Sequence, residues 1–281
     1  MLCEKLTTNF RNYLEQLGYS KGSIKLIPSL VKSFLNYFST KNITAITSID
    51  IINFYNYLQC RQHQKTKEAL SESYINHHVY SLKIFFNWLE ITEQINSNPI
   101  SNVSFKTTKS NERQPLTQHQ ITQLFNVAKT PKEIATLHLF YSCGLRRSEA
   151  EKLNISDIHF AKNLLYVRAG KGAKRRVIPL TEKVTTDFLN AANNNCNNYK
   201  IFLVNNYGNK MTGCNYNNII KNLAKKAAIK SPISLHILRH SIATHLLENG
   251  LSIEFIKEFL GHANLETTQL YVKVKMNLLN F

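Results

Sequence analysis

Apolar and polar positions in the N-terminal part of the chain alternate with the period of amphipathic helices. Apolar side chains recur every three or four residues over Ile24–Phe38 and over Ser71–Glu90, a spacing that places them on one helical face. At about 1.5 Å per residue, the second of these helices would be about 30 Å long. A shorter helix is expected over Ile49–Leu58, and residues 1–18 also have an amphipathic pattern. Because strand-like alternation is scarce here, we predict an all-helical domain over residues 1–97.

The helical periodicity is lost over residues 98–114, which are expected to form a linker. This stretch combines Pro99 with many small polar residues and scattered basic ones, a composition that is typical of linkers. Regular structure is expected to resume at Thr117, which can form a capping box with Gln120. We therefore predict a second domain over residues 115–281.

The second domain is expected to be mostly helical with a small sheet. The pattern predicts helices over Gln118–Ala128 and Lys132–Ser142. Two strand-like runs, Leu164–Arg168 and Arg176–Leu180, flank the sequence GKGAK and indicate a β-hairpin. The rest of the domain has a helical pattern with breaks at four glycines, Gly208, Gly213, Gly250 and Gly261. The predicted fold is mainly α, with a helical N-terminal domain and a mixed α/β domain that contains a small β-hairpin sheet.

Charge narrows the class of partner. The chain has 35 Lys and Arg residues against 18 Asp and Glu residues, a formal net charge of +17. Such an excess favours a polyanion such as nucleic acid, because each neutralised phosphate releases condensed counterions. A ribosomal or membrane-surface protein is the alternative.

Three further features bear on where the protein works. The five cysteines contain no CxxC pair, which argues against a disulfide scaffold or a zinc finger and fits a reducing cytoplasm. No stretch approaches the roughly 18 apolar residues of a membrane span. The start of the chain does not have the pattern of a signal peptide. We expect a cytoplasmic protein with no membrane partner.

Candidate phosphate ligands lie in the second domain. Arg146 follows Gly144 and Leu145 in the sequence GLRRSE, and the planar fork of a guanidinium matches phosphate oxygens. Arg147 competes for the same role, and Glu149 could hold a guanidinium in place. A solvated surface arginine is the structural alternative for this segment taken alone.

His236 and Arg239 are three residues apart and therefore share one face of a predicted helix. Arg239 could neutralise charge on a second phosphate oxygen, and His236 could transfer a proton because its pKa lies near neutrality. His236 and His240 could instead bind zinc, although no Glu lies between them as a metalloprotease would need. His240 and His245 are expected to pack against neighbouring helices.

The tip of the predicted hairpin is strongly basic. Lys171, the lysine in GKG, could protonate a leaving oxygen as a general acid. Lys174 could do the same, and residue type alone does not choose between them. The alternative is that all four basic residues of this segment only contact phosphates, a binding role without chemistry; they are Lys171, Lys174, Arg175 and Arg176.

A tyrosine near the C-terminus is the candidate nucleophile. Tyr271 is one of 13 tyrosines, and ionising a tyrosine hydroxyl at pH 7 costs about 4 kcal/mol. A nearby arginine pair could lower that cost, or a histidine could accept the proton. His262 stands nine residues before Tyr271, after a Leu-Gly break. A core or surface aromatic is the structural alternative.

Taken together, these residues make the chain resemble the tyrosine recombinase (phage integrase) family, most closely its short Xer-like members. The resemblance rests on GLRRSE, GKG, HILRHSIATHLL and LGHANLETTQLY, and it extends over nearly the whole chain. It implies six catalytic residues, Arg146, Lys171, His236, Arg239, His262 and Tyr271. It selects Arg146 over Arg147 and Lys171 over Lys174, and it makes Glu149 the carboxylate that supports Arg146.

The resemblance also implies a reaction and an assembly. Tyr271 would attack a scissile phosphate, form a 3′-phosphotyrosine and release a 5′-hydroxyl, and no metal or other cofactor is implied. The expected partners are double-stranded DNA recombination sites and a tetramer, of this chain or with a paralogue, that acts on two sites through a Holliday junction. The N-terminal domain would be a core-binding (SAM-like) domain that forms a DNA clamp with the catalytic domain, in a nucleoid-associated protein.

Two departures from the family pattern modify these expectations. Ten residues follow Tyr271, whereas Xer-like proteins usually carry a longer C-terminal helix that docks on a neighbouring protomer. No arm-binding domain is expected before the N-terminal helices.

Integration or excision of a mobile element and Xer-type resolution of chromosome dimers remain alternative roles. The alternative functions are a non-catalytic DNA-binding protein derived from a recombinase and a type IB topoisomerase-like nicking-closing enzyme.

Overall fold

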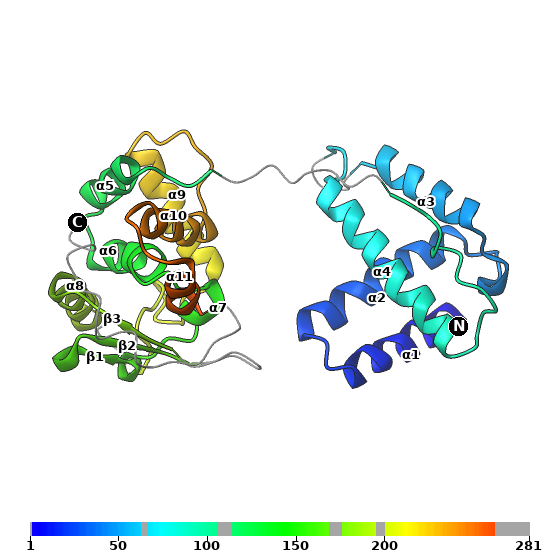
Figure 1. The fold of residues 1–281 in the computed structure, drawn as a ribbon, viewed down its shortest axis with the longest axis horizontal. Helices are drawn as coiled ribbons and strands as arrows, with labels where there is room; N and C mark the ends of the chain where they lie inside the picture. Colours follow the sequence, from blue (N-terminus) through cyan, green and yellow to red (C-terminus); the bar gives the residue numbers. More distant parts are fainter. Residues whose placement is uncertain (1, 63–66, 106–113, 169–175, 195–199, 262–281) are drawn as a thin grey trace. The chain divides into compact units, whose positions relative to one another are not determined.

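A computed structural model describes residues 2–62, 67–105, 114–168, 176–194 and 200–261. The chain forms two compact units, Met1–Ser110 and Asn111–Phe281, and each is described by itself (Figure 1). No helix in the described ranges is long and apolar enough to cross a membrane.

The N-terminal unit is a bundle of helices. Its helical elements in the described residues are α1 (Leu2–Gln16), α2 (Lys21–Tyr37), the 3₁₀ turn η1 (Ile43–Ala45), α3 (Ser48–Cys60) and α4 (Glu72–Ile91). Short polar side chains fix where these helices begin. Ser20 and Ser71 each accept the main-chain N–H three residues further on, and Thr47 forms a capping box with Asp50. The all-helical prediction for this unit is confirmed.

Aromatic side chains fill the core of the N-terminal unit. Phe10, Phe34, Phe54 and Phe86 are buried and come from all four helices. The ring centroid of Phe34 lies 5.1 Å from that of Phe54 and 5.7 Å from that of Phe86, both in edge-to-face geometry. Each such pair adds about 0.5–1.5 kcal/mol beyond the burial of apolar area. Aromatic packing therefore holds the four helices together.

The segment that follows α4 packs on the N-terminal unit. Ile100 is 2 % exposed, and Val103 and Phe105 pack against the same core. The prediction of a linker over residues 98–114 is thus corrected for residues 98–105. Apolar side chains stand between the small polar ones in this segment. Their burial against the core is more favourable than exposure to solvent. Most of the remaining linker residues lie outside the described ranges.

The C-terminal unit combines helices with a small sheet. Its described helical elements are α5 (Gln118–Val127), α6 (Pro131–Leu137), the π-helical turn η2 (His138–Ser142), α7 (Arg147–Ala150), η3 (Ile155–Asp157), η4 (Phe160–Lys162), α8 (Glu182–Asn193), α9 (Gly213–Lys226), α10 (Leu235–Glu248) and α11 (Ile253–Leu260). The strands β1 (Ile158–His159), β2 (Leu164–Val167) and β3 (Arg176–Pro179) form one antiparallel sheet in the order β1-β2-β3. The predicted hairpin is β2 and β3, in which Val167 lies opposite Arg176. The mixed α/β prediction is confirmed.

Two details of the C-terminal unit differ from the sequence prediction. The helix expected over Lys132–Ser142 is α-helical to Leu137 and continues as the fully buried π-helical turn η2. Gly213 was expected to break a helix, but it is the first residue of α9. A Cβ atom at this position would lie 2.1 Å from Cδ of Arg147. Glycine thus leaves room for the side chain of Arg147 at this position, and a larger residue would require that exposed side chain to move.

Helix α10 is held firmly inside the C-terminal unit, beside α9 and α11 (Figure 1). Leu238 is fully buried. The Ser241 hydroxyl accepts the main-chain N–H of Leu116 at 2.8 Å. Near the end of the helix, Nδ1 of His245 lies 2.9 Å from the hydroxyl of Tyr141. Packing and buried hydrogen bonds thus fix the position and the rotation of α10.

A buried histidine affects the stability of the N-terminal unit. His78, on α4, is 1 % exposed, and neither ring nitrogen has a hydrogen-bond partner among the described residues. Burial, together with the positive charge of Arg61, lowers the pKa of His78 to about 4. Folded His78 is therefore neutral over a pH range in which an exposed histidine is protonated.

We expect the N-terminal unit to lose about 2 kcal/mol of stability between pH 7 and pH 5 through His78. Above pH ~6.5 the histidine is neutral in both states, and below it only the unfolded chain binds the proton, so acid favours unfolding. His78→Phe should remove this contribution. Urea unfolding followed by the fluorescence of Trp88, the single tryptophan of the chain, reports on this unit. Equal pH dependence in both proteins would contradict the prediction.

Candidate active site

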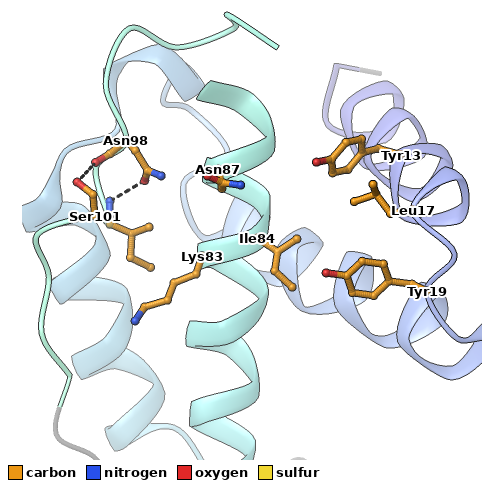
Figure 2. Close-up of a pocket in the computed structure, with 9 residues that line it drawn as sticks. Tyr13, Leu17, Tyr19, Lys83, Ile84, Asn87, Asn98 and Ser101 are labelled. Carbon is orange, nitrogen blue, oxygen red and sulfur yellow. Dashed lines mark hydrogen bonds between the residues drawn. The ribbon is translucent and has the colours of Figure 1, made fainter. Parts of the chain in front are cut away.

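A hollow of about 430 Å³ lies on the surface of the N-terminal unit. Tyr13 of α1, Leu17 just after α1, Lys83 and Asn87 of α4, and Asn98 line it (Figure 2). Its lining residues include no histidine, cysteine or carboxylate among those the structure describes. The hollow therefore lacks the side chains that most often carry acid–base chemistry or bind transition metals, and we do not place the active site there.

Arg146 stands at the beginning of α7, where a carboxylate orients it. Its main-chain N–H donates to Oε2 of Glu149 at 2.7 Å, and its Nη1 donates to Oε1 at 3.0 Å. Its Nη2 donates to the main-chain oxygen of Gly261 at 2.8 Å. Arg147, the competing candidate, lies instead 3.5 Å from Glu151. The side chain of Arg146 is 38 % exposed, so a ligand can reach a guanidinium that is already fixed in direction.

Arg239 reaches the same place from α10. Its Nη1 donates to the main-chain oxygen of Gly144, and its Nη2 donates to that of Leu260 at 2.7 Å. Its Nη1 also lies 3.9 Å from Oε2 of Glu149. Helix α11 ends at Leu260 and is capped by Gly261, which has a left-handed conformation with φ of +67°. The last carbonyls of a helix lack intrahelical partners. The two arginines use these carbonyls as acceptors.

Arg176 completes the cluster and corrects one prediction. The sequence indicates a phosphate contact for this residue, but its side chain is 6 % exposed. Its Nη1 and Nη2 donate to Oε1 and Oε2 of Glu149 at 2.8 and 2.9 Å. Arg176 begins β3, and the alternation that buries Ile178 on this strand also buries Arg176. Strand periodicity could have placed this side chain on the inner face.

Three guanidinium groups thus surround one carboxylate. Burial acts to raise the pKa of Glu149, but the hydrogen bonds and charge of Arg176, with those of Arg146, outweigh it and lower the pKa to about 2. Burial, and the positive charges of Arg146 and Arg176, lower the pKa of Arg239 to about 10. All four groups are charged at neutral pH. The cluster therefore carries positive charge that Glu149 does not cancel, which suits a phosphate.

The histidines of α10 divide between surface and interior. His236 is exposed and lies one turn before Arg239. His245 is buried, as predicted, and burial lowers its pKa. His240 is exposed, so the prediction that it packs against a helix is wrong. A structural zinc site uses four ligands, and the described residues contain no group of three His, Cys, Asp or Glu side chains that could hold a metal.

Five of the predicted site residues lie outside the described ranges, namely Lys171, Lys174, Arg175, His262 and Tyr271. In the sequence, the first three lie between β2 and β3. His262 directly follows Gly261, the residue whose carbonyl accepts from Arg146. The described structure brings together Arg146, Glu149 and Arg239 and places His236 on the helix that carries Arg239.

Comparison with known proteins finds relatives over nearly the whole chain. A model of the Phage integrase family matches residues 114–277, and a model of the phage integrase N-terminal SAM-like domain matches residues 6–95. A tyrosine recombinase of Thermosipho africanus is 32% identical over 275 residues, which are 96% of this chain and 95% of that protein. The tyrosine recombinase XerD of Oceanobacillus iheyensis is 31% identical over 291 residues, covering 97% of this chain and 95% of that protein.

Solved structures share the fold. A lambda integrase dimer bound to a COC′ core site matches with a TM-score of 0.73 at 16% identity, over 93% of this chain and 92% of that one. At this identity the likeness concerns the fold alone. It agrees with the predicted architecture of a helical N-terminal domain followed by a mainly helical domain with a small antiparallel sheet.

We expect Glu149→Gln to destabilise the C-terminal unit by about 3 kcal/mol, because Arg176 and Arg239 would stay buried without a carboxylate. Glu151→Gln is the matched control. It should cost less than about 1 kcal/mol, since Arg147 is largely exposed and the amide oxygen of Gln can still accept the main-chain N–H of Gly213. Denaturant unfolding followed by far-UV circular dichroism at pH 7 measures both. Equal, small losses in the two variants would contradict a central role for the Glu149 carboxylate.

Proposed function

The chain belongs to the phage integrase family of tyrosine recombinases and is a site-specific DNA recombinase; we propose the following roles for its residues. Tyr271 attacks a scissile phosphate, and the bond from its oxygen to phosphorus forms as the bond from phosphorus to the 5′ oxygen breaks. The product is a 3′-phosphotyrosine and a free 5′-hydroxyl. A 5′-hydroxyl from a partner duplex then reverses the step. The covalent link conserves the bond energy, so no ATP is needed.

The observation that carries this proposal is the convergence of Arg146 and Arg239 on one carboxylate. Each guanidinium is held by at least two acceptors within the protein, so little reorganisation is needed when a phosphate arrives. Their uncancelled positive charge would stabilise the two non-bridging oxygens as negative charge builds up in the pentacovalent transition state. Loss of one such donor typically slows a reaction about 10²–10³-fold.

The remaining residues would transfer protons and bind the scissile phosphate. The proton of the Tyr271 hydroxyl would pass to His236, whose type of side chain titrates near neutrality. Lys171 would donate a proton to the departing 5′ oxygen, so that neither an alkoxide nor a phenoxide has to exist free. His262 would donate a hydrogen bond to a phosphate oxygen. We expect these steps to proceed without a metal or another cofactor.

We further propose that the protein acts as a tetramer on two double-stranded DNA sites and passes through a Holliday junction. The support is the similarity of the whole chain to Xer-type recombinases. The tetramer could consist of this chain alone or include a paralogue. Integration or excision of a mobile element and resolution of chromosome dimers both fit this chemistry. We also propose a cytoplasmic, nucleoid-associated location, because the expected substrate is DNA.

We expect the wild-type protein to become covalently attached to a nicked suicide duplex in the presence of EDTA, and Tyr271→Phe to form no adduct. The nick lets the short 5′-hydroxyl fragment diffuse away, so religation fails and the phosphotyrosine accumulates. The duplexes should cover the DNA around the gene, and denaturing gels resolve the adduct. Tyr207→Phe is the matched control, because Tyr207 is 88% exposed and lies in the same unit; it should react like wild type.

Each outcome of this trapping experiment has a distinct meaning. An adduct that persists in Tyr271→Phe would exclude Tyr271 as the nucleophile. Wild-type protein that binds these duplexes tightly and with salt sensitivity, yet forms no adduct, would favour the non-catalytic DNA-binding alternative. An adduct that forms only when a divalent metal is added would contradict the expected absence of a cofactor.

A further inference from the structure

We propose that Arg176 is a positioning residue that neutralises Glu149, so that this carboxylate can orient Arg146 without cancelling the positive charge offered to the phosphate. The inference rests on the proposed recombinase function and adds a residue to its site. Arg176 itself would not touch DNA. It would act through Glu149.

The geometry separates Arg176 from the two arginines that face a ligand. Arg176 makes a two-bond contact with both oxygens of Glu149, at 2.8 and 2.9 Å, whereas Arg146 donates one side-chain bond and Arg239 lies 3.9 Å away. The side chain of Arg176 is 6 % exposed, against 38 % for that of Arg146. Arg176 is therefore the main partner of the carboxylate and is shielded from any ligand.

The contact between Arg176 and Glu149 determines how much net positive charge the site offers to a phosphate. Glu149 is needed beside Arg146 because its carboxylate binds both the main-chain N–H and the guanidinium of that residue. A carboxylate so close to the phosphate site would also repel the phosphate and offset the charge of one arginine, since these interactions are strong where water is scarce. With Arg176 in place, the Glu149–Arg176 pair is neutral overall. Arg146 and Arg239 then keep their full charge for the substrate.

Arg176 also connects three segments of the site. It is the first residue of β3 and follows the hairpin tip that contains Lys171 in the sequence. Its guanidinium lies against Gly261, where a Cβ atom would be 2.7 Å from Nη1 of Arg176. One side chain thus contacts the carboxylate behind Arg146 and the end of α11, and it belongs to the hairpin. A displacement of Arg176 would therefore change the contacts of all three segments.

The test compares two substrates that differ in charge at the scissile position. A methylphosphonate replaces one charged non-bridging oxygen by a methyl group. A site with too little positive charge should therefore be impaired on the phosphate and much less on the methylphosphonate. We expect Arg176→Met to slow adduct formation about 10–100-fold on the phosphate suicide duplex and by less than about 3-fold on the methylphosphonate, each relative to wild type. Single-turnover rates at saturating protein give these ratios.

Three further variants calibrate the measurement. Arg146→Met should show the same relief on the methylphosphonate, because it also removes positive charge. Arg176→Lys keeps the charge and loses the two-bond fork, so its ratio between the two substrates should stay within about 3-fold of the wild-type ratio. Arg168→Met breaks another ion pair of the same hairpin, with Asp157, and should leave that ratio unchanged.

The inference and the recombinase proposal fail in different ways. Equal slowing of Arg176→Met on both substrates would show a merely structural role, and wild-type rates on both would show none; either result overturns the inference. If Arg176→Met does not fold, as judged by circular dichroism, Arg176→Lys decides, because a relief on methylphosphonate like that of Arg146→Met would contradict the charge argument. Wild-type protein that forms no adduct on the phosphate duplex would instead overturn the recombinase proposal.

Discussion

The arrangement of the catalytic unit depends on one carboxylate that holds three guanidinium groups. Arginines repel one another, so Arg146, Arg176 and Arg239 can share a small volume only with Glu149 between them. They come from the start of α7, from β3 and from α10, and the cluster therefore ties these elements together. A buried ion cluster contributes little net stability compared with apolar packing. An anionic ligand gives the cluster a better explanation, because the cluster keeps positive charge in a fixed position.

Two glycines allow the surrounding main chain to come close enough to serve the cluster. Gly144 and Gly261 have φ of +55° and +67°, a region that residues with a side chain rarely adopt. A Cβ atom at Gly144 would lie 2.7 Å from Leu260, and one at Gly261 would meet Arg176 at the same distance. The main-chain oxygens of Gly261 and Gly144 accept hydrogen bonds from Arg146 and Arg239, respectively. The conformation of the two glycines therefore helps to orient both guanidinium groups.

Much of the fold could be predicted from local pattern. Helical periodicity and capping residues, such as Thr117 and Gln120 before α5, located most helices because these signals depend on neighbours a few residues away. The pattern failed where burial depends on distant partners. Residues 98–105 are polar enough to read as linker, yet Ile100 is buried against the N-terminal core. The π-helical turn His138–Ser142 likewise has no local signal, since its five residues are all enclosed by other elements.

For the site, the sequence by itself determined the types of the candidate residues, their order along the chain and the family they indicate. These depend on short motifs, such as the arginine after Gly-Leu in GLRRSE, which can be recognised without the fold. It also indicated that Glu149 could support Arg146, since Glu149 stands three positions after it in the sequence. Only the tertiary structure decided that Arg176 belongs to the same carboxylate, since Arg176 stands 27 positions after Glu149 in the chain. The physical reason is that charges separated by many residues interact through space, and their distance and burial exist only once the chain has folded.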